Sequence, residues 1–211
     1  MQIFLHGLGQ TPESWNETIT RFKSSGQILC PNLAELLHGK AADYQSLYEA
    51  VSALCNQTDG KLDLCGLSLG GVLALQYAIE QPGKVRSLVL IAPQYKMPKN
   101  LLRVQNLLFR FMPESAFQAT GFEKNAFIRL CGSMMDLDFS RSLSAVACPV
   151  LILCGERDSA NRKAAGKLAE LLRNAEMQEI PGAGHEVNLD APEKLAEALR
   201  RFYQRAGQKI S

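Results

Sequence analysis

Short apolar runs alternate along the chain with longer segments in which apolar residues recur at helical spacing. Most of the short runs are continuously apolar, which indicates strands covered on both faces. The alternation predicts βαβ units, and hence an α/β fold with a doubly wound, mostly parallel sheet of about six strands. The strand candidates are Gln2 to Leu5, Gln27 to Cys30, Lys61 to Cys65, Val85 to Ile91, Val150 to Cys154 and Glu176 to Ile180.

The segment from Gln94 to Ala147 interrupts this alternation, because it contains no convincing strand but several short helical patterns. A long insertion between two strands of a parallel sheet commonly covers a site at the carboxyl ends of the strands. We therefore expect a single domain, residues 1–211, with a helical lid insertion over about residues 94–147. Its apolar side chains form either the core of the lid or an apolar substrate pocket, for which the candidates are Leu101, Leu108, Phe111, Phe127 and Met134.

The composition is that of an ordinary globular domain, with 46% hydrophobic and 21% charged residues. The net charge of +2 comes from scattered basic and acidic residues, which gives little reason to expect nucleic acid or a membrane surface as a partner. The first residues lack the features of a secretion signal, and the longest apolar runs fall far short of the roughly 20 residues that span a bilayer. We expect a soluble, cytoplasmic protein, and the pattern does not predict its oligomeric state.

Cysteine usage argues against a metal site. The six cysteines are too dilute for a disulfide scaffold, and three lie inside apolar strand-like runs, where reduced cysteine behaves as a small hydrophobe. There is no CxxC pair, so we expect no structural zinc.

The strongest chemical signal is Gly66-Leu67-Ser68-Leu69-Gly70, between a predicted strand and a predicted helix. A serine on such a tight turn is held in a strained conformation that projects its hydroxyl, and the flanking glycines avoid collisions with the neighbouring strand and helix. The context therefore predicts a nucleophile at Ser68 rather than an incidental serine in a glycine-rich turn. The backbone N–H groups of Leu69 and of Leu8, in the loop His6-Gly7-Leu8-Gly9, are the expected oxyanion-hole donors.

A serine hydroxyl needs a base to take its proton, and the chain has three histidines. His185 follows the last predicted strand in a glycine-rich loop, so it falls at the same edge of the sheet as Ser68. His38 lies in a polar loop that suits a solvated residue, and the ring of His6 suits bracing the loop after the first strand. We therefore predict that His185 is the base.

An acid is then needed to fix the tautomer of His185 and to stabilise its protonated form. Asp158 lies in Gly155-Glu156-Arg157-Asp158, directly after a predicted strand. It therefore falls at the same edge of the sheet as Ser68 and His185. Its rival Glu156 is nearer the strand end, where we expect it to point sideways or to pair with Arg157.

Four motifs, HGLG, GLSLGG, GERD and GAGH, occur in this order, and with them the chain resembles the α/β-hydrolase superfamily over nearly its whole length. The order serine, aspartate, histidine is the one that these enzymes use. The resemblance implies a small single-domain serine hydrolase that forms an acyl-enzyme without metal or organic cofactor. Family members usually carry two further strands before the HG loop, so we expect a sheet that lacks them. The loop at 31–39 also departs from the Asp-Leu-Pro-Gly-His-Gly pattern of many relatives.

These features predict hydrolysis of a carboxylic ester or thioester, with a small-molecule acyl substrate. Two alternatives stay open: a carbon–carbon bond hydrolase or lyase with the same triad, and a non-catalytic ligand-binding protein on a hydrolase scaffold. Seven basic against four acidic residues between Gln94 and Arg141 favour an anionic substrate, but solvated helix faces explain the excess equally well. The sequence does not predict the substrate itself.

Overall fold

The core of the protein is one six-stranded, all-parallel sheet in the order β2-β1-β3-β4-β5-β6. This computed structural model describes residues 1–24 and 26–208, apart from the side chains at 101, 119, 207 and 208. The strands are β1 (Gln2–Leu5), β2 (Ile28–Leu29), β3 (Leu62–Leu67), β4 (Val85–Ile91), β5 (Val150–Gly155) and β6 (Ala175–Ile180). The predicted α/β class is confirmed, and each strand ends within two residues of its predicted bounds.

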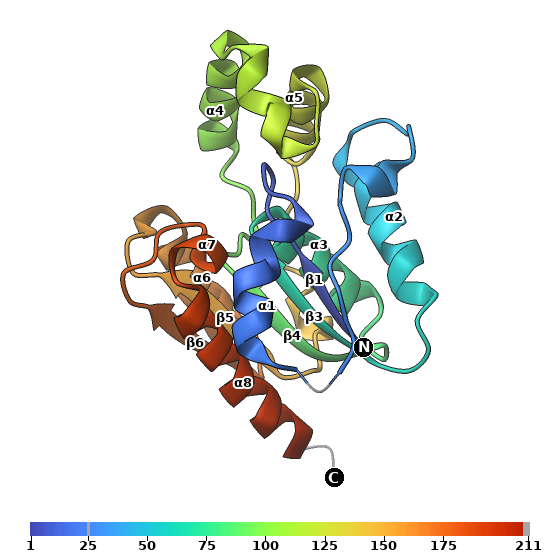
Figure 1. Ribbon diagram of the computed structural model, residues 1–211, viewed down its shortest axis with the longest axis vertical. Helices are drawn as coiled ribbons and strands as arrows, with labels where there is room; N and C mark the ends of the chain where they lie inside the picture. Colours follow the sequence, from blue (N-terminus) through green and yellow to red (C-terminus); the bar gives the residue numbers. More distant parts are fainter. Residues whose placement is uncertain (25, 209–211) are drawn as a thin grey trace.

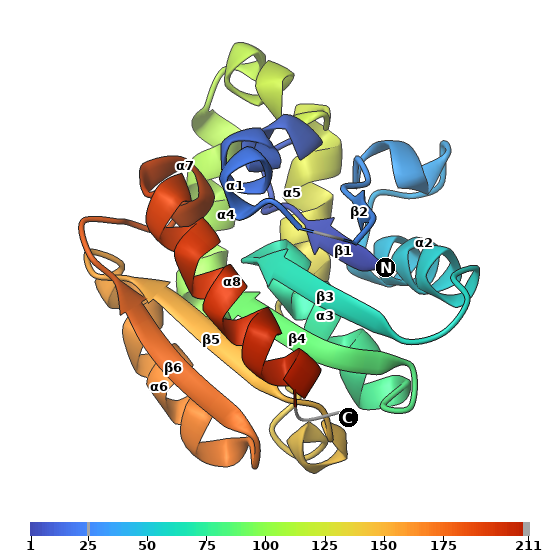
Figure 2. The same cartoon turned by 60° about the horizontal axis from the view of Figure 1, so that its bottom comes forward.

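Helices cover both faces of the sheet (Figures 1 and 2). On one face α1 (Asn16–Phe22) packs against α8 (Pro192–Gln208), with the short α7 (Val187–Asp190) leading into α8. The other face carries α2 (Tyr44–Asn56), α3 (Leu69–Glu80) and α6 (Ser159–Leu171). Short 3-10 helices join these elements: η1 (Pro12–Trp15), η2 (Glu35–Leu37), η3 (Glu114–Thr120) and η4 (Leu143–Ala145).

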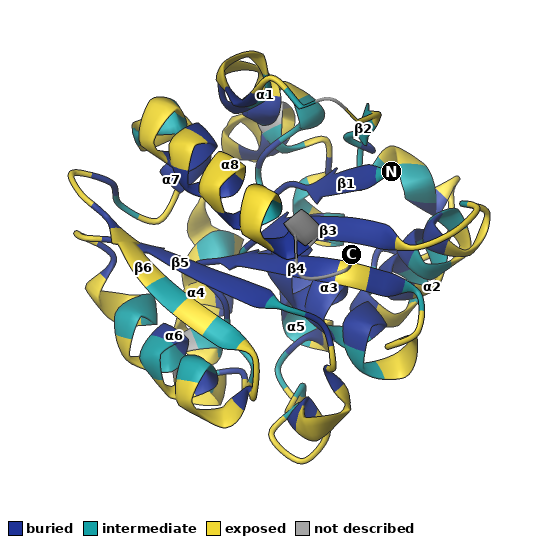
Figure 3. Cartoon of the chain, turned by 90° about the horizontal axis from the view of Figure 1, so that it is seen from below, coloured by how far each residue is buried: buried dark blue, intermediate teal, exposed yellow. Residues whose placement is uncertain are grey.

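Two hydrophobic clusters fill the space between the sheet and these helices. Along β1, Phe4 belongs to the cluster under α1 and α8, whereas Ile3 and Leu5 belong to the cluster on the opposite face. Successive side chains of a strand point to opposite faces, so a strand covered on both sides must be continuously apolar. Figure 3 shows this burial in the central strands, while the edge strand β6 is partly exposed and buries only Ile180.

Local sequence explains where two of the helices begin. Asp43 caps α2, because its carboxylate accepts a hydrogen bond from the N–H of Ser46 at 2.8 Å. Pro192 is the first residue of α8, a position where its missing N–H costs nothing.

A helical segment lies between β4 and β5, above the carboxyl ends of the strands (Figure 1). It comprises α4 (Lys99–Phe111), η3, α5 (Lys124–Ser133) and η4. Its helices share an aromatic core, in which the ring of Phe127 lies 5.1 Å from the rings of both Phe109 and Phe117. A bridge between Lys96 and Asp138 joins the two ends of the segment. Among the described residues, the structure has no helix with the length and apolar character needed to cross a bilayer.

Candidate active site

Ser68 lies at the sharp turn between β3 and α3, with φ 52° and ψ −114°. A positive φ is strained for a residue with a side chain and persists only where the surroundings fix it. Here the N–H of Ser68 donates to the carbonyl of Ile91 at 2.9 Å, and its carbonyl accepts from the N–H of Val72 at 3.0 Å. The sheet and the helix therefore hold the serine in the strained geometry that the sequence motif predicted.

The glycines beside Ser68 are required by close backbone approach. A Cβ atom on Gly66 would lie 2.3 Å from the carbonyl oxygen of Gly70, and one on Gly70 would lie 2.2 Å from the carbonyl oxygen of Leu5. Real Cβ atoms do not approach backbone atoms this closely. The turn can therefore bring β3, α3 and β1 together only without these side chains.

His185 and Asp158 meet at the same edge of the sheet. Nδ1 of His185 lies 2.9 Å from Oδ2 of Asp158, and the side chains are 42% and 5% exposed respectively. A carboxylate only accepts hydrogen bonds, so Nδ1 carries the proton and Nε2 is left as an acceptor. Ser68 and His185 line one cavity, and the structure records no hydrogen bond between them in the part of the chain that it describes. Such bonds are often long before substrate binds.

The rival acid Glu156 has a different role. Its Oε2 accepts a hydrogen bond from the N–H of Gly182 at 2.7 Å. We expected Glu156 to point sideways or to pair with Arg157. The hydrogen bond that the structure shows is the one from the N–H of Gly182. Glu156 therefore braces the loop that leads to His185, while Asp158 contacts the imidazole.

Sequence reasoning missed two residues that support Asp158. Nδ2 of Asn161 lies 2.9 Å from each carboxylate oxygen of Asp158, and Nε2 of Gln94 donates to Oδ1 of Asn161 at 2.7 Å. Asn161 could have been suspected, because Asp158 caps α6 and a residue three positions later lies beside the cap. Gln94 lies 67 positions before Asn161 and gave no such signal.

A second missed network anchors the loop that contains Leu8. The side chains of Gln10 and Asn188 exchange hydrogen bonds at 3.1 and 3.2 Å, and Gln10 also accepts from the N–H of Gly7 at 3.3 Å. Asn188 is fully buried just after His185 in the chain. The amide pair therefore ties the loop after β1 to the segment that carries the histidine.

The other two histidines lie away from the cavity. Nε2 of His6 accepts from the N–H of Leu33 at 3.1 Å, so Nδ1 carries the proton and donates to the carbonyl of Gly7 at 2.9 Å. Burial lowers the pKa of His6 below 6.5, although the Gly7 carbonyl opposes the shift. His38 is exposed in a left-handed turn with φ 46°. These positions agree with the roles expected from the sequence, in which His6 braces the loop after the first strand and His38 is a solvated surface residue.

The cavity beside Ser68 has a volume of about 820 Å³ and lies between the sheet edge and α4 and α5. Apolar side chains dominate its wall: Leu8, Leu69, Val72, Met97, Leu102, Phe127, Cys131 and Met134. Leu8 and Leu69, the expected oxyanion donors, thus lie at the cavity beside the serine. A second hollow of about 440 Å³ lies at the opposite edge, where β5 and β6 begin, and it contains no serine, cysteine or histidine.

Only some of the predicted pocket residues line the cavity. Phe127 and Met134 line the cavity. Leu108 and Phe111 do not, because the face of α4 that carries them points to solvent, and this part of the expectation was wrong. The side chain of Leu101 lies outside the described residues. In residues 1–24 and 26–208, no group of three or more His, Cys, Asp or Glu is placed to hold a metal ion.

A parallel sheet with helices on both faces and a strained serine after β3 define a hydrolase of the α/β type. The chain belongs to the alpha/beta hydrolase family, whose sequence profile matches residues 2–198. The family predicted from the four motifs is therefore confirmed.

Several known proteins resemble the chain. The pimeloyl-(acyl-carrier protein) methyl ester esterase of Pectobacterium carotovorum is 23% identical, over 96% of this chain and 93% of that protein. The biotin biosynthesis bifunctional protein BioHC of Cellvibrio japonicus is also 23% identical over 96% of this chain, which spans only 47% of that longer protein. A solved structure of a thermophilic esterase from Thermogutta terrifontis shares the fold, with a TM-score of 0.80 and 20% identity over 97% of this chain and 89% of that one.

Proposed function

We propose that the protein hydrolyses a carboxylic ester or thioester through an acyl-enzyme intermediate. Ser68 is the nucleophile, His185 the general base and Asp158 the acid that orients the histidine. One observation carries the proposal: the 2.9 Å contact between His185 and Asp158 lies at the cavity whose wall includes Ser68. The names of the relatives, two of which are esterases, support an ester as the substrate.

The chemistry follows from the tautomer of His185. Oγ of Ser68 attacks the carbonyl carbon of the substrate while Nε2 of His185 takes the hydroxyl proton. The imidazolium then gives this proton to the leaving alcohol or thiol as the bond from carbonyl carbon to leaving group breaks. Water repeats the sequence on the acyl-enzyme, with His185 as base, and releases the acid and free Ser68.

The negative charge that develops on the carbonyl oxygen needs fixed donors. The N–H groups of Leu8 and Leu69 suit this role, because neither donates a hydrogen bond to another protein group within the described chain. Leu69 is also the first residue of α3, where the unpaired N–H groups give the helix a partial positive charge. One such donor is worth about 10² to 10³ in rate.

The wall of the cavity favours an apolar acyl group. Leu102, Phe127 and Met134 come from the segment between β4 and β5, which we propose acts as a lid over the serine. The volume lies within the range of roughly 300 to 1,000 Å³ typical of small-molecule sites. Closure by apolar side chains would exclude water around the reacting carbonyl and strengthen its hydrogen bonds to the backbone donors.

A panel of p-nitrophenyl esters of increasing acyl length, and of matching thioesters, tests the proposal. We expect saturable turnover by the wild type and loss of at least about 10³-fold in Ser68→Ala. Ser142→Ala, at an exposed serine before η4, is the matched control and should keep full activity. Turnover that survives Ser68→Ala would overturn the proposal. So would turnover of vinylogous diketones with no turnover of any ester or thioester, because that result indicates carbon–carbon cleavage.

A further inference from the structure

The helix α4 turns an apolar stripe toward solvent. The four exposed side chains are Val104 at 58%, Leu107 at 53%, Leu108 at 60% and Phe111 at 80%. Their spacing of three, four and seven residues places them along one face of the helix. The opposite face is occupied already, since Asn106 is buried and Phe109 packs edge-on against Phe127. The stripe is therefore a second apolar face, free of contacts with the core of the segment.

Such a contiguous apolar patch usually marks an interaction surface. Large apolar residues exposed singly need no explanation, and Leu171 and Leu189 are examples elsewhere on this chain. The stripe differs because four large side chains follow one another over two turns of one helix. It also lies on the segment that covers the cavity, since Leu102 and Gln105 of α4 contribute to the cavity wall.

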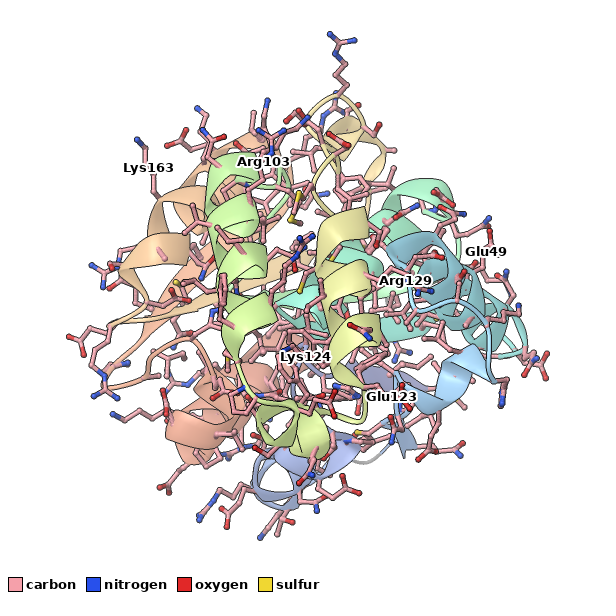
Figure 4. The ribbon with its side chains drawn as sticks, turned by 90° about the horizontal axis from the view of Figure 1, so that it is seen from above. Glu49, Arg103, Glu123, Lys124, Arg129 and Lys163 are labelled. Atoms are coloured by element: carbon pink, nitrogen blue, oxygen red, sulfur yellow. The ribbon has the colours of Figure 1, made fainter. Side chains whose placement is uncertain are left out.

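The charged residues of α4 itself are all basic. α4 carries Lys99, Arg103 and Arg110, and the sequence has no acidic residue between Glu80 and Glu114. Arg103 and Arg110 are seven positions apart, so they follow one flank of the stripe. Lys99 pairs with Asp136 at 2.6 Å. Figure 4 looks down on this side of the molecule and shows two further basic residues on the elements beside α4, Lys124 on α5 and Lys163 on α6, with the acidic Glu123 next to Lys124.

We propose that α4 docks onto an anionic lipid surface, a partner that the small net charge of the whole chain did not lead us to expect. An amphipathic helix with apolar residues on one face and arginine or lysine beside it lies in the plane of a membrane, with its apolar side chains in the acyl layer and its cations at the phosphates. The exposed apolar stripe and its basic flank match this arrangement. This interaction goes beyond the proposed hydrolysis and does not depend on it.

A second copy of this chain fits the stripe less well. A stable dimer buries about 800 Å² on each partner, whereas the stripe offers one face of a 13-residue helix. A two-fold pairing of stripes would also bring the basic flanks of two α4 helices close together, and like charges repel. A lipid surface needs no matching shape and supplies the opposite charge.

Co-sedimentation with vesicles tests the proposal, using phosphatidylcholine alone and phosphatidylcholine with a third of phosphatidylglycerol. We expect the wild type to partition at least about tenfold more strongly onto the anionic vesicles, and high salt to weaken this binding. Leu108→Asp combined with Phe111→Asp should reduce the partitioning by about tenfold or more. Arg103→Gln combined with Arg110→Gln should reduce it by about tenfold on anionic vesicles only.

The matched control is Leu171→Asp, which changes an exposed leucine on α6 and should bind vesicles as the wild type does. Unchanged melting temperatures and unchanged turnover of a water-soluble ester would show that the stripe variants are folded. Absence of vesicle binding by the wild type would overturn the proposal, as would equal binding by the wild type and the stripe variant. A concentration-dependent dimer that the stripe variant abolishes, without vesicle binding by either protein, would instead assign the stripe to a second copy.

Discussion

Nδ1 of His185 lies 2.9 Å from Oδ2 of Asp158, and this contact determines which imidazole nitrogen carries the proton. Asp158→Asn should lower kcat for an ester by about 10³ to 10⁴, because an amide can also donate and so favours the wrong tautomer. Glu156→Gln is the control, since Glu156 accepts a bond from the N–H of Gly182 and should change kcat by less than about threefold. A larger loss in Glu156→Gln than in Asp158→Asn would reverse the assignment of the acid.

Asn161 should act by positioning Asp158. Its amide lies 2.9 Å from both carboxylate oxygens, so Asn161→Ala frees the carboxylate to rotate away from His185. We expect kcat to fall by about tenfold with KM within about twofold of the wild type. Asn174→Ala removes an asparagine at the opposite edge of the sheet and should change neither constant. A rise in KM at constant kcat would show that Asn161 contacts the substrate instead.

Gly70 should tolerate no side chain. A Cβ atom there would lie 2.2 Å from the carbonyl oxygen of Leu5, so Gly70→Ala must displace the backbone of β1 or α3. We expect a loss of about 3 kcal/mol or more in the free energy of unfolding, which lowers Tm by roughly 6 to 12 °C in a domain of this size. Gly83→Ala is the matched control, because no atom lies within 4 Å of its Cβ position. Equal melting temperatures for the two variants would contradict the close approach seen at the turn.

His6 should make stability depend on pH. Its neutral Nε2 accepts the N–H of Leu33, and burial lowers its pKa below the ordinary value of 6.5. The unfolded chain therefore binds a proton more readily, and the stabilisation present above pH 6.5 is lost as the pH falls toward the lowered pKa. Urea unfolding of the wild type should show a larger loss of stability between pH 7.5 and 5.5 than unfolding of His6→Asn. An identical loss in both proteins would rule out His6 as the source.

The strands of the sheet and the turns that carry the candidate catalytic residues could be predicted because local sequence determines them. A strand covered on both faces, such as β5, must be continuously apolar, and the strained turn at Ser68 needs glycines at Gly66 and Gly70. Residues that follow parallel strands meet at one edge, which is why Asp158 and His185 were placed together. These inferences needed no knowledge of how distant segments pack.

The orientation of α4 could not be predicted in this way. Helical spacing shows that Leu108 and Phe111 share a face, but it does not show whether that face meets the cavity or solvent. Leu102 and Gln105 line the cavity because Phe109 anchors the helix through contacts with Phe117 and Phe127. The contact of Gln94 with Asn161 likewise depends on the placement of β4 beside β5, and no local sequence pattern indicates it.

Labelling with a fluorophosphonate, followed by mass spectrometry of the modified peptide, tests the central claim most directly. The reagent reacts with a serine that a neighbouring base has activated, so we expect one phosphonylated residue, Ser68, in the wild type. Labelling should disappear in Ser68→Ala and slow by at least about 10³-fold in His185→Ala. Modification of a different residue, or equal labelling of Ser68 in the wild type and His185→Ala, would contradict a nucleophile activated by His185.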